Sequence, residues 1–326
     1  MPLRNVRDTV ILAKVESVYA TDPTPTAALN AILCSKPSIK PLNSRNVDRD
    51  LVRPYFGASE QLVGTRSVTC ELEVELAGSG TAGTAPAFGP LLRACALAEV
   101  IIAVTRVDYV PITNAQESVT FWYYDSGVLH KFTGARGNAK FGMLSGDRPG
   151  IMFSFEGLLT TLTAATPATV DFSAFRTPLV VTDANSGDLT FGATVASTGA
   201  PAITGGTVYP SLGLELDLGN QVEFTPLLGG ETVDVTNRSL GGSIKLDLTQ
   251  AQEVTFFASV LAASLQALSL LHGTVAGNRF IVHQPTVQLF DYSLEEINGK
   301  RLIGYKTRGV PTPGGGGNDE FRLVFF

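Results

Sequence analysis

Residues 65–77 form the clearest predicted strand, because apolar and polar side chains alternate strictly from Ser67 to Leu76, and this alternation constrains the fold more than any other feature of the chain. Successive side chains of a β-strand point to opposite faces, so a period of two predicts one buried and one solvated face. Side chains two apart on a strand are separated by about 6.6 Å, which is too wide for one compact cation site without a second strand. A solvated electronegative strip is therefore expected on one face of a sheet. The apolar set is Val68, Cys70, Leu72, Val74 and Leu76, and the polar set is Thr69, Glu71, Glu73 and Glu75.

The chain from residue 90 to residue 160 is rich in residues that favour strands. A helix is expected over 91–103, because Pro90 is tolerated in the first turn of a helix. Asp125-Ser126-Gly127 predicts a tight hairpin, since glycine adopts the positive φ that such turns need. The predicted strands are 107–112, 118–124, 128–133, 139–144 and 151–159.

The second half repeats the order of these elements. An Arg-Ser pair enters an alternating strand at 64–76 and again at 237–248, and a helix is expected after each, the second over 251–272 as an amphipathic packing helix. Gly277-Asn278 then leads into strands, as Gly137-Asn138 does in the first half. The match lies in order and pattern, with little identity, and indicates a degenerate duplication. The further strands predicted here are 212–218, 280–289, 301–305 and 321–326.

These patterns predict a mainly β chain with four parts. Residues 1–50, punctuated by Pro and Asn, form an N-terminal arm that either docks on a neighbour or covers its own domain. Residues 51–160 and 206–326 form two tandem domains, each with a flanking α-helix. Residues 161–205 are rich in Thr, Ala, Gly and Pro and form a linker or insertion that carries a short hairpin at 179–195.

The low share of charged residues favours self-association. Charged residues make up 17% of the 326 residues, against about 25% in a typical chain. A soluble monomer needs a charged surface to resist association, so much of this surface is expected to be covered by copies of the chain. A β-rich monomer with a Thr/Ser/Gly surface is the alternative. The net charge of −6, without a Lys/Arg cluster, argues against tight binding of nucleic acid.

The cysteines and the hydropathy of the chain indicate in which cellular compartment the protein folds. Cys34, Cys70 and Cys95 are odd in number and widely spaced, which gives no disulfide framework or metal signature and fits a reducing cytoplasm. The N-terminus lacks the apolar segment and cleavage site of a signal peptide. The uncharged stretch 254–271 has polar side chains on one helical face, so insertion into a membrane is not expected.

The sequence offers no arrangement for catalysis, and no catalytic, cofactor-binding or metal-binding residue is predicted. His130, His272 and His283 stand alone, outside any metal-ligand spacing. Gly314–Gly317 lack the Lys-Ser/Thr of a phosphate-binding loop and form a flexible connection. Trp122, Tyr123 and Tyr124 have no basic companions for stacking on single-stranded nucleic acid, so packing or interface anchoring is favoured.

Three blocks of sequence, in this order, resemble the tail tube (major tail) proteins of long-tailed bacteriophages of the siphophage type. They are LAKVESVYATDPTPTAALNA at 12–31, FGPLLRACALA at 88–98 and YYDSGVLHKFTGARGN at 123–138. The resemblance covers most of residues 8–160, and the second half is similar in pattern only. It implies β-sandwich domains with a flanking helix, whose strands join those of neighbouring subunits in a barrel around a channel, with rings stacked axially. The protein would then be a structural component of the virion tail, assembled in the host cytoplasm, with no cofactor.

The resemblance also implies partners and site residues. Duplicated members imply trimeric rings with pseudo-sixfold symmetry, favoured here over hexamers, and tail terminator, tape measure and distal tail proteins as partners. Double-stranded DNA would pass without specific binding. Segments 1–50, 78–89 and 160–205 are candidate contacts between rings. Candidate acidic groups facing the channel are Glu71, Glu73, Glu75, Glu215, Asp217 and, more weakly, Asp247. Candidate inter-subunit residues are Lys14, Glu16, Asp22, Pro23, Trp122, Tyr124, His130 and Arg136.

Two other classes of protein remain open at this point. One is another β-sandwich phage assembly protein, such as a capsid decoration protein or the inner tube of a contractile injection system. The other is a glycan-active enzyme, which needs two carboxylates facing one another across a groove. The carboxylates in 65–77 stand in a row on one strand face, which argues against the enzyme.

Overall fold

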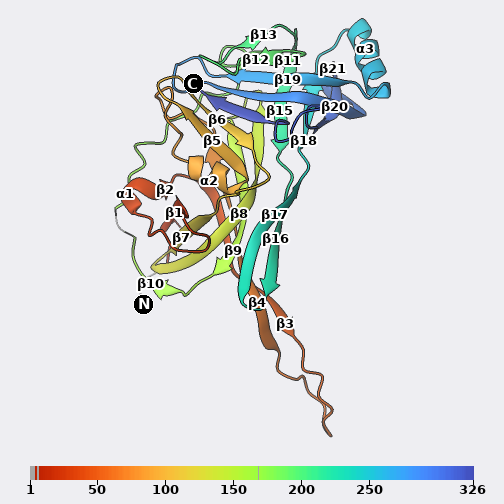
Figure 1. Cartoon of the computed structure of the whole chain (residues 1–326). Helices are drawn as coiled ribbons and strands as arrows, with labels where there is room; N and C mark the ends of the chain where they lie inside the picture. Colours follow the sequence, from red (N-terminus) through yellow and green to blue (C-terminus); the bar gives the residue numbers. More distant parts are fainter. Residues whose placement is uncertain (1–3, 6, 168) are drawn as a thin grey trace.

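In the part of the chain that the structure describes, the fold is mainly β, as predicted, with three short helices (Figure 1). The computed structural model describes residues 4–5, 7–167 and 169–326. The elements up to residue 164 are, in chain order, β1 (Thr9–Val15), α1 (Ala27–Asn30), β2 (Ala31–Ile32), β3 (Ser35–Val47), β4 (Leu62–Glu75), α2 (Gly89–Ala94), β5 (Leu97–Ile102), β6 (Arg106–Pro111), β7 (Val119–Asp125), β8 (Val128–Leu144), β9 (Gly150–Leu159) and β10 (Thr163–Ala164).

The rest of the chain has the same character. Its elements are β11 (Leu189–Phe191), β12 (Thr194–Val195), β13 (Ile203–Thr204), β14 (Thr207–Tyr209), β15 (Ser211–Asp217), β16 (Asn220–Leu227), β17 (Gly230–Arg238), β18 (Gly241–Leu246), α3 (Gln250–Leu261), β19 (Leu265–His272), β20 (Phe280–Ile297), β21 (Lys300–Gly309) and β22 (Arg322–Phe325).

The two halves share one pattern of strand pairing. In the first half the neighbours run β1, β7, β8, β9, β4, β3. In the second half they run β11, β19, β20, β21, β18, β15. The strands that occupy equivalent places also follow one another in the same order along the chain, with α2 and α3 inserted at the same point. The structure therefore contains an internal repeat, which the sequence shows only as a pattern.

The two repeats join edge to edge through β8 and β15. These strands pair antiparallel, with Leu216 opposite Phe141 and Leu214 opposite Met143. All four side chains are buried on the core side of the sheet. Each contributes about 1.5–3 kcal/mol by leaving water, so the junction is itself part of the core. The result is one sheet, called the spanning sheet below, in the order β3, β4, β9, β8, β15, β18, β21, β20.

One face of the spanning sheet is apolar and the other is polar. The apolar face belongs to a hydrophobic core that extends through both repeats, from Val68 and Leu72 of β4 to Ile244 of β18 and Tyr305 of β21. Helix α2 packs against this core with Leu91 and Leu92 fully buried. The opposite face, called the polar face below, carries the other member of each alternating pair. The β16–β17 hairpin lies against part of it, where Arg136 of β8 bonds to Val233 and Asp234. The part around Glu73, Lys140 and Glu215 lines an open hollow.

Both predicted long helices are shorter than expected, and the second part of each is a strand. Helix α2 ends at Ala94, and Ala96 takes a positive φ of 57°, after which the β-branched run Val100–Ile102 pairs with β6. Helix α3 ends at Leu261, and Ala263 has a φ of 50° before Leu265–His272 pairs with β20. The prediction of an amphipathic helix over 251–272 was therefore wrong, because ladder hydrogen bonds to β20 outweigh the helical spacing of the leucines.

Other predicted elements are confirmed or corrected in detail. The hairpin at Asp125 is confirmed: Ser126 and Gly127 have φ values of 47° and 88°, and Asp125 lies opposite Val128. The strands predicted at 128–133 and 139–144 form the single strand β8. The hairpin expected at 179–195 is wrong, because the observed hairpin in this region pairs Thr194–Val195 with Ile203–Thr204.

Residues of the predicted arm take part in the sheets. Strand β1 pairs over its whole length with β7, and its Ile11 and Ala13 are core residues. Strand β3 pairs with β4 in a long hairpin that projects from the lower end of the molecule in Figure 1, with β16 and β17 beside its base. The division into parts at 1–50, 51–160, 161–205 and 206–326 stays a prediction.

Candidate functional site

The structure places the acidic channel candidates together on the polar face. Strand register gives one row from Glu75 through Gly150, Gly142 and Glu215 to Ser243. The next row runs from Glu73 through Met152 and Lys140 to Asp217. Glu71 lies in the row after that, opposite Ser154 of β9. Five of the six candidates therefore lie in a patch that crosses the junction of the repeats, with Asp247 just beyond the end of β18.

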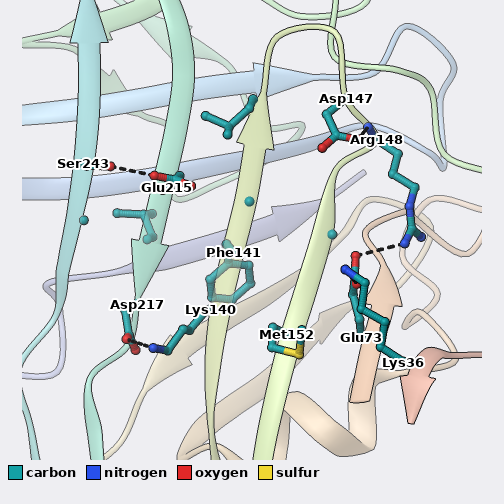
Figure 2. Close-up of a pocket in the computed structure, with 15 residues that line it drawn as sticks. Lys36, Glu73, Lys140, Phe141, Asp147, Arg148, Met152, Glu215, Asp217 and Ser243 are labelled. Carbon is teal, nitrogen blue, oxygen red and sulfur yellow. Dashed lines mark hydrogen bonds and ion pairs between the residues drawn. The ribbon is translucent and has the colours of Figure 1, made fainter. Parts of the chain in front are cut away.

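Cations that the sequence analysis did not select lie among these carboxylates. Arg148, in the turn between β8 and β9, donates to Glu73 at 3.0 Å (Figure 2). It also donates to Glu75 at 3.0 Å. Lys36 of β3 approaches the other oxygen of Glu73 at 2.6 Å. The guanidinium is planar and presents several donors, so it can hold two carboxylates at once. The end of β4 is therefore a neutralised cluster rather than a bare acidic strip.

A second cluster lies at the junction of the repeats. Lys140 of β8 forms an ion pair with Asp217 of β15 at 3.0 Å (Figure 2). Asn138 donates to the same carboxylate at 2.7 Å. Burial alone would raise the pKa of Asp217, but the hydrogen bonds from Asn138 and Gly219 and the charge of Lys140 outweigh it and lower that pKa. Asp217 is therefore held as a carboxylate that links the two strands across the junction.

The remaining candidates continue this pattern. Glu215 accepts a hydrogen bond from Ser243 at 2.8 Å (Figure 2), and Asp247 forms an ion pair with Lys300. Of the six candidates, Glu71 and Glu215 form no ion pair with any residue in the part of the chain that the structure describes. Most of the acidic candidates on the polar face are thus paired with cations, and Glu71 and Glu215 are the two that are not paired with any described cation.

The alternation of side chains in the sequence predicts the glutamates of the polar face. No sequence pattern near them predicts the cations with which they pair. Arg148 and Glu73 are 75 residues apart, and Lys36 and Glu73 are 37 apart. Lys140 does stand in the run Ala139–Leu144, where every second residue is apolar. That period marks Lys140 as a residue of the polar face once the strand is known.

The inter-subunit candidates have well-defined contacts inside the chain. Glu16 is buried and accepts hydrogen bonds from Ser118 and Thr120 at 2.6 Å and from the amides of Gly134 and Ala20 at 2.7 Å. Four donors satisfy this carboxylate and fix the loop after β1 to β7 and β8. Glu16 is thus an internal anchor, and any additional contact with a neighbouring subunit stays a prediction.

The second group of these candidates surrounds the Asp22 loop. Asp22 forms an ion pair with Lys131 at 2.6 Å and accepts from the indole nitrogen of Trp122, while the Lys131 ammonium lies 4.3 Å from the centre of the Trp122 ring. Lys14 donates to the carbonyl of Pro23 at 2.9 Å. Tyr124 is buried in a small satellite cluster with Leu12. Burial lowers the pKa of the half-buried His130.

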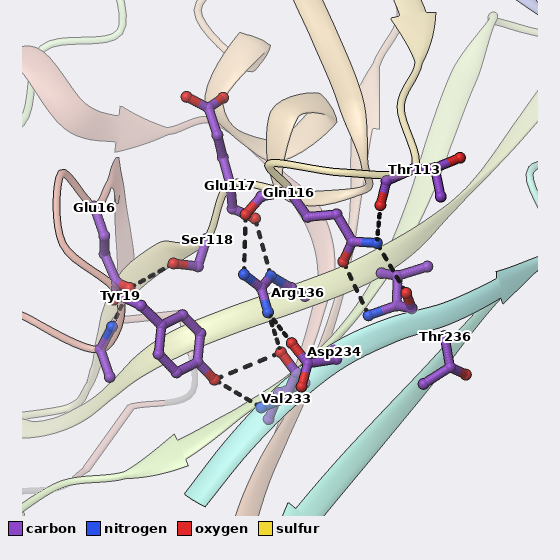
Figure 3. Close-up of polar contacts among 12 residues, drawn as sticks. Glu16, Tyr19, Thr113, Gln116, Glu117, Ser118, Arg136, Val233, Asp234 and Thr236 are labelled. Atoms are coloured by element: carbon purple, nitrogen blue, oxygen red, sulfur yellow. Dashed lines mark hydrogen bonds and ion pairs between the residues drawn. The ribbon is translucent and has the colours of Figure 1, made fainter. Parts of the chain in front are cut away.

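Arg136 connects the first repeat to the β16–β17 hairpin of the second (Figure 3). Its guanidinium donates to the carbonyl of Val233 at 2.7 Å, to the carbonyl of Gln116 at 2.9 Å and to the carboxylate of Asp234. It also lies 4.8 Å from the centre of the Tyr19 ring. These contacts hold the hairpin against the first repeat.

Two further side chains bind the exposed edge of β17. The amide of Val233 donates to the Tyr19 hydroxyl at 2.6 Å, and the Gln116 side chain pairs with both the amide and the carbonyl of Val235 (Figure 3). Side-chain amides and hydroxyls thus satisfy the edge that a neighbouring strand would otherwise use. Tyr19 and Gln116 were missed by the sequence analysis, since nothing in their spacing marks a contact more than 100 residues away.

The described residues offer little for chemistry. They contain no group of three or more His, Cys, Asp or Glu side chains placed to hold a metal ion. No helix among them is long and apolar enough to span a bilayer. The most prominent hollow is an open one on the polar face, lined by the paired charges of Figure 2. Two of its carboxylates, Glu73 and Asp217, are paired with cations, and Glu215 accepts a hydrogen bond from Ser243, an arrangement suited to a passive surface.

Comparison with known proteins decides which family carries this fold. A family model described as phage tail tube protein matches residues 6–322. The chain belongs to the phage tail tube protein family. The match includes the second repeat, for which the sequence analysis found similarity in pattern only. The protein is thus a structural tail tube protein of a bacteriophage virion. The search among curated proteins found no match.

Proposed function

We propose that this tail tube protein closes into rings that stack into the tube of a phage tail, with the polar face turned to the channel. The observation that carries the proposal is the spanning sheet. It runs unbroken through both repeats, buries one face against the core and leaves the other face open and charged around Glu73, Lys140 and Glu215. A sheet of this kind forms a segment of a barrel wall, and closure by further copies removes its free edges.

The charges of the polar face suit the passage of DNA. Phosphates bind proteins mainly through Lys and Arg, with release of counterions. Here Arg148, Lys140 and Lys36 each face a carboxylate, so these three cations are already paired, and Glu71 and Glu215 add carboxylates without an ion pair to the described residues of the same surface. DNA therefore meets a surface that neither attracts it strongly nor offers a specific contact.

The finer assignment rests on the repeat and on the family resemblance. Two repeats per chain favour a trimeric ring with pseudo-sixfold symmetry over a hexamer. We assign the protein to a phage tail of the siphophage type, assembled in the host cytoplasm, where tail terminator, tape measure and distal tail proteins are its partners. Contacts along the ring close on themselves, whereas axial contacts repeat and build a tube.

Negative-stain microscopy of the purified chain tests the proposal. Stacked rings or tubes with a central channel are the expected result. Class averages of a ring should show three chains, or six units of density where the two repeats of each chain are resolved. A monomer that persists at millimolar concentration, with no rings at any salt concentration, would contradict it.

A further inference from the structure

The second half of β20 has an open edge. Residues up to Gln288 pair on one side with β19, but beyond that point only β21 is bonded to the strand among the described residues. Exposure changes at the same place: Phe280–Gln284 are buried, whereas Leu294 is 55% exposed although it opposes the buried Ile303. A strand that continues past its partner, with apolar side chains left in solvent, is an unfilled pairing site.

The equivalent strand of the first repeat is filled. β8 pairs with β7 in its first part and with β9 on its other side, as β20 does with β19 and β21. Its last part, Lys140–Leu144, pairs antiparallel with β15. Phe141 and Met143 are buried there, in contrast to Leu294 in β20. The β8–β15 pairing therefore indicates which kind of strand would cover the equivalent edge of β20: a strand in the position of β15.

The strand equivalent to β15 in the first repeat is β3. Both are the outermost strands of their repeats, and each pairs with the equivalent strand, β18 or β4, through a register shift near its start. β3 bonds only to β4 among the described residues, so its outer edge is open as well. Each chain therefore ends in two complementary open edges, one at each end of the spanning sheet.

The charges of these two edges are opposite. β3 carries the exposed cations Lys36, Lys40 and Arg45, and it has no acidic residue. The open part of β20 carries Asp291, Glu295 and Glu296 and has no basic residue. Asp291 and Glu295 form ion pairs with Lys306 and Lys245 of the chain itself, and Glu296 forms none with the described residues. Opposite charges on adjacent strands stabilise pairing, and like charges oppose it, so neither edge is suited to pair with a copy of itself.

We propose that β20 of one chain pairs antiparallel with β3 of a second copy, from about Leu289 to Ile297, and that this pairing is the ring junction. The inference rests on the proposed ring and identifies its contact. The β20–β3 pairing between chains has the same geometry as the β8–β15 pairing within a chain. Around the closed ring, β8–β15 junctions within chains therefore alternate with β20–β3 junctions between chains. A head-to-tail contact of this kind closes into a ring.

Cysteine cross-linking tests the pairing. In a Cys34→Ser background, one chain carries Ser293→Cys on the polar face of β20. A second chain carries a single cysteine on the polar face of β3, at Ser35, Ser38, Lys40 or Asn43 in turn. The two chains are mixed before assembly and oxidised mildly, because opposed cysteines on paired strands lie close enough for a disulfide. The matched control replaces Ser293→Cys with Ser243→Cys, on the polar face of β18 between two paired strands.

Microscopy of the same samples separates the outcomes. A covalent dimer with one or two neighbouring β3 positions, absent from the Ser243→Cys control, is the expected result. Rings or tubes without a dimer at any of the four positions would overturn the β20–β3 junction and leave the tube intact. Absence of rings and tubes with the Cys34→Ser chain and with the natural sequence would overturn the proposed function, and this inference with it.

Discussion

A single methyl group at Gly213 tests whether the two repeats form one continuous wall. Gly213 lies in β15 opposite Leu144 of β8, and its φ is +105°, a region that side chains rarely adopt. A Cβ atom there would come within 2.0 Å of the Met143 carbonyl oxygen. That oxygen belongs to the backbone of the partner strand, so Gly213→Ala can be accommodated only if the strands separate locally.

The cost has two parts. An unfavourable backbone conformation costs about 1–2 kcal/mol, and loss of one ladder hydrogen bond costs about 1 kcal/mol more. With an unfolding entropy of about 2.1 cal/mol/K for each of the 326 residues, a total of about 3 kcal/mol lowers Tm by about 4 °C. Thermal unfolding followed by circular dichroism measures this shift.

Gly142→Ala is the matched control. Gly142 lies on the other strand of the same junction, opposite Glu215, and a Cβ there meets no atom within 4 Å. This variant should match the natural chain or be more stable by up to about 1 kcal/mol, since alanine restricts the unfolded chain. Equal Tm values for the two variants would refute the argument that β15 and β8 are packed backbone to backbone.

Four further predictions follow from individual contacts. Glu16→Gln should lower the free energy of unfolding, measured by denaturant titration, by about 2 kcal/mol. The NH2 group of glutamine would face buried groups that donate hydrogen bonds to the Glu16 carboxylate. Arg136→Ala should increase hydrogen exchange in β17 without changing exchange in β4. Glu73→Gln with Glu75→Gln should leave Arg148 unpaired, so that assembled tubes retain DNA in a salt-dependent manner in filter binding. Burial lowers the pKa of His283 to about 4, so stability should fall as pH drops from about 6.5 to about 4, by up to about 3 kcal/mol, and His283→Asn should flatten this dependence.

Each of these has an informative control. For the Glu73→Gln and Glu75→Gln variant the control is Glu71→Gln, which removes an exposed carboxylate of β4 that has no ion pair with the described residues and should change neither stability nor DNA retention. Uniform exchange in the Arg136→Ala variant would mean that the β16–β17 hairpin is held by Tyr19 and Gln116 alone. A stability that rises on acidification from pH 6.5 to pH 4 would contradict the pKa direction of His283, because the unfolded state binds the extra proton in that interval.

The sequence predicts the parts of the fold that are governed by local period. The alternation in 65–77 and 212–218 predicts strands with the correct buried face, and the Ser126-Gly127 turn predicts its hairpin from backbone conformation alone. The acidic candidates on the polar face come from the same alternation. A period of two assigns each side chain to a face, and strand pairing can only keep that assignment or reverse it as a whole.

The rest depends on partners that are distant in the chain. The leucines of 261–272 have helical spacing, yet the second part of this segment is β19, because β20 offers it a ladder that an isolated helix cannot match. The apolar side chains Val254, Phe257 and Leu261 of α3 are exposed, and Phe256 is the buried one, so these three residues do not pack α3 against the core. The cations that neutralise the polar face come from β3, β8 and the β8–β9 turn, and only the pairing of these strands with β4 and β15 brings them there.

Helical reconstruction of assembled tubes by cryo-electron microscopy tests the central claim most directly. We expect one closed barrel in which the polar face of the spanning sheet, with Glu71, Lys140 and Glu215, lines the channel, and helices α2 and α3 lie outside it. A reconstruction in which every chain seals its own sheets, or in which this face is turned to the exterior of the tube, would contradict the account.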